Sequence, residues 1–227
     1  MQCLRDTQTE AQQAISRLVS AYPLWTSSAC PVEKWPSLVA KFSSRYEVDI
    51  SPPARQWRKK RGQCSAHLVG AALPPDAAGV ETVRWVLLVT EKGKGEVKEQ
   101  EKLRDARRDR IVWGDYVLMR MARPRQHGGG SRWTWCLTPQ VERQEANYLT
   151  GLAQAAARGG DSSRLLAYTQ ILVRRPMHSG VRTQIAKMLR RARRVWDQHS
   201  ESRPWPGPVP DDLPILTYRR RDGRLAQ

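Results

Sequence analysis

The chain has 227 residues, enough for one large domain or two small ones around a buried core. Hydrophobic residues make up 40% of the chain, and this share excludes disorder along its whole length. Because 39 Lys and Arg face 22 Asp and Glu, the net charge at pH 7 is +17, an excess that is usually kept for a polyanionic partner.

The N-terminal part of the chain is predicted to be helical. Apolar residues at helical spacing predict one helix over residues 7–22 and a second over residues 32–46. Ser51, Pro52 and Pro53 then mark a break in the chain.

The middle of the chain is predicted to form a sheet. Expected strands cover residues 65–73, 83–90, 111–121 and 132–138, and a charged, solvated helix is expected over residues 96–110. The second strand is apolar on both faces, which indicates a central position in the sheet. The last two strands flank a loop with three consecutive glycines, and together they predict a hairpin with a long tip.

The C-terminal part returns to helix. Thr138 and Pro139 are typical of a helix N-terminus, and helices are expected over residues 139–158, 161–175 and 179–198. The Pro-rich stretch after them is expected to be an extended tail that packs back on the helices or stays loose.

These elements predict an α+β fold, with a small mixed or antiparallel sheet of about four strands. N-terminal helices precede the sheet and a three-helix segment follows it. The expected divisions are a helical segment over 1–54, a sheet core with a basic arm and a long hairpin loop over 55–138, a helical region ending in a basic helix over 139–202, and a Pro-rich tail over 203–227.

The positive charge is unevenly distributed along the chain. Residues 1–54 and 138–173 are each neutral overall, whereas residues 55–137 carry 18 basic and 9 acidic groups. Residues 174–202 carry eight basic groups and two acidic ones. The excess therefore lies in two blocks, which predicts one or two basic patches rather than a uniform coat.

The first candidate site is the basic arm, residues 55–61. Lys and Arg neutralise phosphates and release counterions, and a tryptophan among them can stack on an unpaired base. The alternative is a solvated linker whose tryptophan packs on the sheet. The candidate contacts are Arg55, Trp57, Arg58, Lys59, Lys60 and Arg61.

The second candidate site is the last helix, because the stretch from Arg174 to Trp196 that contains most of it has eight basic residues and no acidic one. Solvated helix faces normally mix both signs of charge, so the pattern favours docking on a nucleic-acid backbone. The alternatives are an ordinary amphipathic surface helix or, less favoured because the core needs the apolar stripe, a membrane-surface helix. The candidate contacts are Lys187, Arg190, Arg191, Arg193 and Arg194.

Two loops are further candidates. The hairpin loop carries Arg123, Arg125 and Arg132 beside its glycines, a pattern that suits insertion into a groove, although the charge can also be incidental. The segment 92–95, Lys-Gly-Lys-Gly before a predicted helix, is a weak phosphate-loop candidate because it lacks a Walker A pattern. Strand tryptophans are more typical of a core than of base stacking.

The cysteines and histidines predict neither a metal site nor a cofactor. The four cysteines are far apart and form no C-x-x-C pair, so we expect free thiols in a reducing compartment. No histidine lies in a metal-binding or hydrolase motif. His67 and His127 are weak catalytic candidates, and each is more simply explained as a bystander.

No stretch approaches 18 consecutive apolar residues, and the first residues lack the pattern of a signal peptide, so we expect a cytoplasmic protein without a membrane partner. The most favoured function is nucleic-acid binding, to DNA or RNA, as a non-enzymatic subunit of a larger nucleoprotein complex. One alternative is a metal-independent endoribonuclease similar in logic to enzymes that process CRISPR repeat RNA. The other is a structural adaptor for an acidic protein partner.

The abundance of Arg and Trp in these basic segments resembles that of accessory proteins from bacterial plasmids and other mobile elements. This resemblance implies a bacterial or mobile-element setting for the complex. It assigns no residue of this chain to a role.

Overall fold

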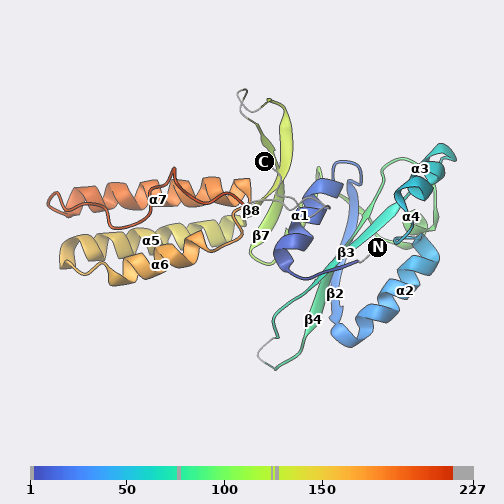
Figure 1. The fold of residues 1–227 in the computed structure, drawn as a ribbon, viewed down its shortest axis with the longest axis horizontal. Coiled ribbons are helices and arrows are strands. Elements are labelled where there is room, and N and C mark those ends of the chain that lie inside the picture. The colour runs from blue at the N-terminus through green and yellow to red at the C-terminus, as the bar shows by residue number, and fades with distance from the viewer. Residues whose placement is uncertain (1–2, 76–77, 124, 126–127, 217–227) are drawn as a thin grey trace. The chain divides into compact units, whose positions relative to one another are not determined.

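The computed structural model describes residues 3–75, 78–123, 125 and 128–216. The chain forms two compact units, Met1–Ile111 and Val112–Gln227. Each unit combines helices with its own sheet, so the predicted α+β class is confirmed (Figure 1). The strands that the sequence interpretation grouped into one sheet core are divided between two sheets, because the chain leaves the first sheet before residue 112.

The first unit is built on a five-stranded sheet with the order β1-β3-β4-β2-β5. β4 lies at its centre, as its two apolar faces predict, and pairs antiparallel with β3 and β2. β1 pairs parallel with β3 at one edge, and β5 pairs with the first two residues of β2 at the other. The strands are β1 (Leu4–Arg5), β2 (Leu24–Pro31), β3 (Ala66–Ala72), β4 (Thr82–Val89) and β5 (Arg104–Asp105).

Helices cover both faces of this sheet. The helix α2 (Trp35–Tyr46), which follows the short 3-10 helix η1 (Val32–Lys34), packs its aromatic residues on one face together with Leu68 of β3. The neighbouring His67 points to the opposite face, where it meets Tyr22 just after α1 (Gln8–Leu18). The first unit therefore buries its sheet between two helical layers (Figure 1).

Two segments of the first unit differ from the sequence interpretation. The basic arm is part of a helix, α3 (Pro52–Lys60), and not a linker. The charged helix expected over 96–110 is only α4 (Glu96–Gln100), because Glu101 adopts an extended backbone and the chain then pairs with β2 as β5. Backbone pairing of β5 with β2 thus takes the place of the second half of the expected solvated helix.

The second unit contains a three-stranded antiparallel sheet, β6 (Val112–Trp113), β7 (Tyr116–Ala122) and β8 (Ser131–Leu137), in that order. The predicted hairpin between the last two strands is confirmed. The single strand expected over 111–121 is instead two strands, since the chain turns at Gly114, which has a positive φ of 58°.

Three helices follow the second sheet, as predicted: α5 (Pro139–Gly159), α6 (Ser163–Val173) and α7 (Ser179–His199). The Thr138 hydroxyl caps α5 by accepting a hydrogen bond from the Val141 amide at 3.5 Å. The tail packs back along α7, since Arg182 Nε donates to the Leu213 carbonyl at 3.1 Å. No helix of the described ranges is long and apolar enough to cross a membrane.

The first turn of α7 is joined to β8 by a close backbone approach. The Gly180 amide donates to the Thr134 hydroxyl at 3.2 Å, and the Ser179 hydroxyl lies 2.9 Å from the same oxygen. A Cβ at position 180 would lie 2.5 Å from the Trp135 carbonyl oxygen. Only glycine lets α7 start against the strand, so this residue positions the basic helix on its unit.

Replacing Gly180 with alanine is expected to destabilise the second unit by about 2–3 kcal/mol, because the added methyl forces the helix away from a packed strand. Gly151 is the matched control: it lies within α5 with open space around its Cα. Gly151→Ala is expected to stabilise by about 0.5–1 kcal/mol, as alanine favours helix. Urea unfolding of both variants checks this, and equal effects would contradict the role given to Gly180.

Candidate nucleic-acid interface

The helix α3 has a capping residue at each end. The Ser51 hydroxyl accepts a hydrogen bond from the Ala54 amide at 3.4 Å, and Pro52 occupies the first turn. At the other end the Gly62 and Gln63 amides donate to the carbonyls of Lys59 and Arg58 at 3.1 and 3.0 Å, in a Schellman arrangement around Gly62. Ser51 and Pro52, which the sequence analysis interpreted as part of a break in the chain, therefore start this helix.

Arg55 is a correction to the predicted set of phosphate contacts. Its side chain is buried, only 4% of the residue is exposed, and its guanidinium donates to the backbone carbonyls of Val48 and Ala66 and interacts with Tyr22. Burial also lowers the pKa of the guanidinium. Arg55 anchors α3 to the end of β3 and does not face solvent.

The remaining residues of the basic arm divide into two groups. Arg58 is partly buried, pairs with Glu47 and donates to the Cys64 carbonyl at 3.2 Å. Lys59 lies with its ammonium 5.2 Å from the ring centroid of Tyr22. Lys59 is nevertheless exposed, as are the other members of the arm, Trp57, Lys60 and Arg61.

Trp57 and Arg61 form an exposed stack. The guanidinium carbon of Arg61 lies 3.5 Å from the ring centroid of Trp57, one helical turn away, and 53% of Trp57 is exposed. Lys60 is exposed beside them, and Trp57 and Lys60 share one helix face because they are three residues apart. This group therefore keeps the exposed cations and the exposed tryptophan that the sequence analysis assigned to the basic arm.

The segment 92–95 lies against the end of α3. The Cys64 amide donates to the Lys94 carbonyl at 2.9 Å, and the Lys94 amide donates to the Gly62 carbonyl at 3.0 Å. The basic arm and the segment 92–95 are some thirty residues apart in the sequence. Backbone hydrogen bonds directly after the arm therefore hold them together. Lys94 is exposed, and its backbone is hydrogen-bonded to the turn that ends α3. We group Lys94 with Trp57, Lys60 and Arg61 as the α3 platform.

The same segment does not form a phosphate-binding loop. The Lys98 ammonium donates to the carbonyls of Glu91 and Gly93 at 2.5 and 2.8 Å, so the loop directs carbonyl oxygens toward a lysine. The following helix, α4, has only five residues. The glycine serves packing instead, since Gly93 has a φ of +92° and a Cβ there would lie 2.5 Å from the Cys64 amide nitrogen.

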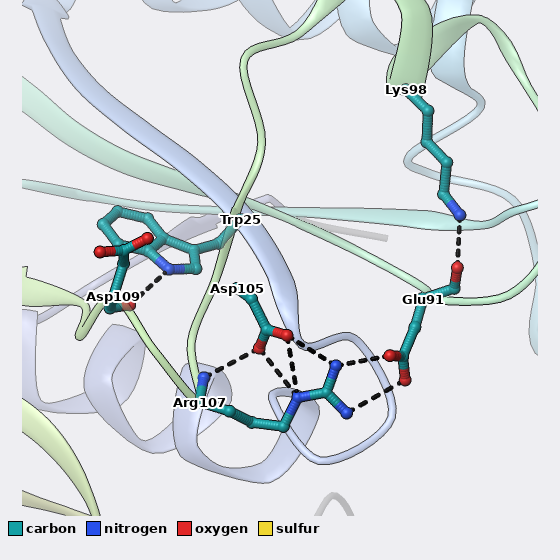
Figure 2. Close-up of polar contacts among 6 residues, drawn as sticks. All are labelled: Trp25, Glu91, Lys98, Asp105, Arg107 and Asp109. Atoms are coloured by element: carbon teal, nitrogen blue, oxygen red, sulfur yellow. Dashed lines mark hydrogen bonds and ion pairs between the residues drawn. The ribbon is translucent and has the colours of Figure 1, made fainter.

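Arg107 is neutralised by two carboxylates (Figure 2). Its guanidinium pairs with Glu91 at 2.5 Å and with Asp105 at 2.6 Å, and the hydrogen bonds from Arg107 lower the pKa of both carboxyls. Beside this clamp the indole Nε1 of Trp25 donates to the Asp109 carbonyl at 2.9 Å. The clamp joins the turn after β4 to the segment after β5 and withdraws Arg107 from any anionic partner.

In the second unit, one face of α7 is basic and exposed. Lys187, Arg190, Arg191 and Arg194 recur at the three- and four-residue spacing of a single helix face, and all four are exposed. They span roughly 10 Å of helix axis at 1.5 Å per residue. We call this surface the α7 basic face.

Some of the α7 charges are paired and some are not. Arg190 pairs with Asp211 of the tail at 2.5 Å, and Arg193 lies 4.0 Å from Asp197. Lys187, Arg191 and Arg194 make no ion pair with any residue that the structure describes. Arg193 also lines a groove between the end of α7 and the tail, together with Trp205.

The hairpin carries a second group of exposed arginines in this unit. Arg120 Nε donates to the Ser131 hydroxyl at 2.6 Å across the two strands, which holds its side chain on the hairpin. The predicted contacts Arg123, Arg125 and Arg132 are exposed as well. His127 lies outside the described residues.

The strand tryptophans are mostly core residues, as the sequence favours. Trp85, Trp113 and Trp135 are buried, and Trp133 is partly buried. The structure describes all nine tryptophans, and Trp57 is the one among them that is exposed. The positions of the strand tryptophans therefore do not support base stacking on either sheet.

The geometry removes His67 from the catalytic candidates. Its ring is buried, 4.6 Å from the ring of Tyr22, and burial together with Arg55 and Lys59 lowers its pKa to about 3. A neutral, buried imidazole cannot reach a substrate proton. His178 is also buried, and its pKa is lowered to about 4 by desolvation.

Within the described ranges, no three His, Cys, Asp or Glu side chains gather as a metal site would require. No disulfide joins the four cysteines, all of which the structure describes, and Cys64 and Cys136 are buried. Comparison of the chain with protein-family models, with curated proteins and with solved structures found no match. The fold and the site therefore define the class, an α+β protein of two units with exposed basic surfaces.

Replacing Gly93 with alanine is expected to destabilise the first unit by about 2–3 kcal/mol, because a positive φ and a backbone clash act together. Gly62 is the control, since its φ is also positive, +69°, but its surroundings are open. Gly62→Ala is expected to cost only about 1 kcal/mol. Thermal unfolding of the two variants measures the difference, and similar losses would show that the close approach at Gly93 is unimportant.

The buried His67 makes stability depend on pH. Its pKa is about 3 when folded and 6.5 when unfolded, so protonation favours the unfolded chain and stability falls as the pH drops from 6.5 toward 3. In His67→Phe, the loss of unfolding free energy between pH 7 and pH 5 is expected to be smaller by about 2 kcal/mol. Urea unfolding at both pH values tests this; parallel losses in the two proteins would contradict a neutral buried His67.

Proposed function

We propose that this protein binds nucleic acid through its phosphate backbone, as a non-enzymatic component of a nucleoprotein complex. The observation that carries the proposal is the α7 basic face, on which Lys187, Arg191 and Arg194 point to solvent without a described carboxylate partner. Unpaired cations on a rigid helix repel one another. A bound polyanion offsets this repulsion because its negative charges neutralise them.

The surroundings of this face support a backbone contact. The residues that line α7 toward its unit are apolar and buried, among them Ile185, Leu189 and Trp196, so the helix is held firmly by its opposite side. The hairpin of the same unit has exposed arginines and no acidic residue between positions 116 and 141. Both features suit a ligand whose negative charges repeat along a chain.

An acidic protein remains the competing kind of partner. The test that separates the two is the salt dependence of binding, since a nucleic acid releases condensed counterions and an acidic protein surface releases few. The ribonuclease alternative loses support from His67, whose ring is buried and neutral. RNA incubated with the protein in EDTA is expected to stay intact; cleavage under these conditions would revive that alternative.

Replacing Lys187, Arg191 and Arg194 with glutamine is expected to weaken binding to a 20-base-pair duplex. At about 0.9 per phosphate contact, the slope of log K against log salt should become shallower by up to about 3. Fluorescence anisotropy from 50 to 300 mM salt measures both quantities.

The matched control removes the same charge from the same unit. Arg143, Arg158 and Arg164 lie exposed on α5 and α6 and pair with no carboxylate that the structure describes. The glutamine variant of these three should keep most of the affinity and slope. Equal losses of affinity in the two triple variants would show that the α7 basic face acts only through the net charge of the protein. No binding by the wild-type protein near 150 mM salt would sink the proposed function.

A further inference from the structure

The α3 platform in the first unit combines an exposed aromatic ring with several cations. Trp57 is 53% exposed at a point where the helix is held from its other side by the buried Arg55. Because about half of the Trp57 side chain is not covered by the core, its ring is available for a contact outside the chain. This ring is separate from the α7 basic face, which belongs to the other unit.

Arg61 prepares the ring for such a contact. Its guanidinium lies over the ring at 3.5 Å, the separation of stacked planar groups, and covers one side of the indole. Arg61 is the C-cap residue of α3, and its position is set by the Gly62 turn that ends the helix. It pairs with no carboxylate in the part of the chain that the structure describes, so its charge is not cancelled.

Two further cations belong to the elements that carry this stack. Lys60 belongs to the same helix face as Trp57, and Lys94 is held next to the Gly62 turn by two backbone hydrogen bonds. Both lysines are exposed and unpaired among the described residues. The α3 platform therefore combines one planar apolar ring with exposed positive charges, which suits bases that alternate with phosphates along a strand.

We propose that the α3 platform binds single-stranded nucleic acid by stacking an unpaired base on Trp57. This inference rests on the proposed function and names its substrate class. In a duplex the bases are stacked on each other and present only their edges, so the ring gains its contact only from an unpaired base. Lys60 and Lys94 neutralise the neighbouring phosphates, while Arg61 holds the ring in place.

The deciding experiment compares wild-type, Trp57→Ala and Trp57→Phe full-length proteins on three ligands, each 12 positions long. These are oligo-dT, a strand of equal charge in which every base is missing, and a 12-base-pair duplex. Because stacking contributes about 1–3 kcal/mol per base, Trp57→Ala should weaken oligo-dT binding by about 5- to 150-fold. Binding to the abasic strand and to the duplex should change less than twofold, and Trp57→Phe should keep part of the oligo-dT affinity.

A spectroscopic measurement separates stacking from a loss of folding. Binding of oligo-dT should quench tryptophan fluorescence in the wild-type protein and quench it less in Trp57→Phe, with unchanged thermal unfolding in both. Lys60→Gln with Lys94→Gln should weaken oligo-dT and abasic strands equally, because these lysines contact phosphates.

Three outcomes would overturn the inference. Unchanged oligo-dT binding by Trp57→Ala would show that the ring takes no part. An equal loss on oligo-dT, abasic strand and duplex would show that Trp57 acts without stacking on a base. In both cases the α7 basic face can still bind duplex, so the proposed function survives. Binding of no nucleic acid by the wild-type protein would remove both proposals together.

Discussion

The shortage of acidic side chains constrains the whole molecule, because 22 carboxylates cannot neutralise 39 Lys and Arg. The carboxylates that the fold uses lie where segments must be joined. Glu91 and Asp105 clamp Arg107 between two loops of the first unit, and Glu145 holds Arg175 at 2.5 Å in the second. The Glu145–Arg175 pair is partly buried, where an unpaired charge costs most, whereas at the surface water screens a charge. The cations left unpaired therefore gather on the outside, on α3, on α7 and along the hairpin.

Rigid backbone contacts hold these outer surfaces in position. Arg55 joins α3 to β3 by donating to buried carbonyls, and Gly180 lets α7 begin against β8. Neither residue is part of a binding surface, yet each decides where one lies. Arg55 thus has a structural role that its residue type alone does not reveal, because its burial depends on neighbours that are distant in the sequence.

Sequence patterns predicted the elements with strong periodicity and missed those that depend on pairing. The helices α5, α6 and α7 and the strands β3, β4 and β8 lie close to their expected positions. The strand β2 was missed because its middle, Thr26 to Ser28, is polar and lacks an alternating pattern; it forms because it pairs along its length with β4. The helix α3 had recognisable signals in Ser51 and Pro52 at its start and in Gly62 after its end, but Ser51 and Pro52 were interpreted as part of a break in the chain.

By itself the sequence determined the α+β class, the uneven charge and the basic character of α7, since these follow from composition and from the 3.6-residue period of one helix. The tertiary structure decided which cations are available. It buried Arg55 and His67, and it brought Lys94 from a separate loop to the Gly62 turn that ends α3. Burial and backbone pairing join residues far apart along the chain, and local patterns carry no information about such contacts.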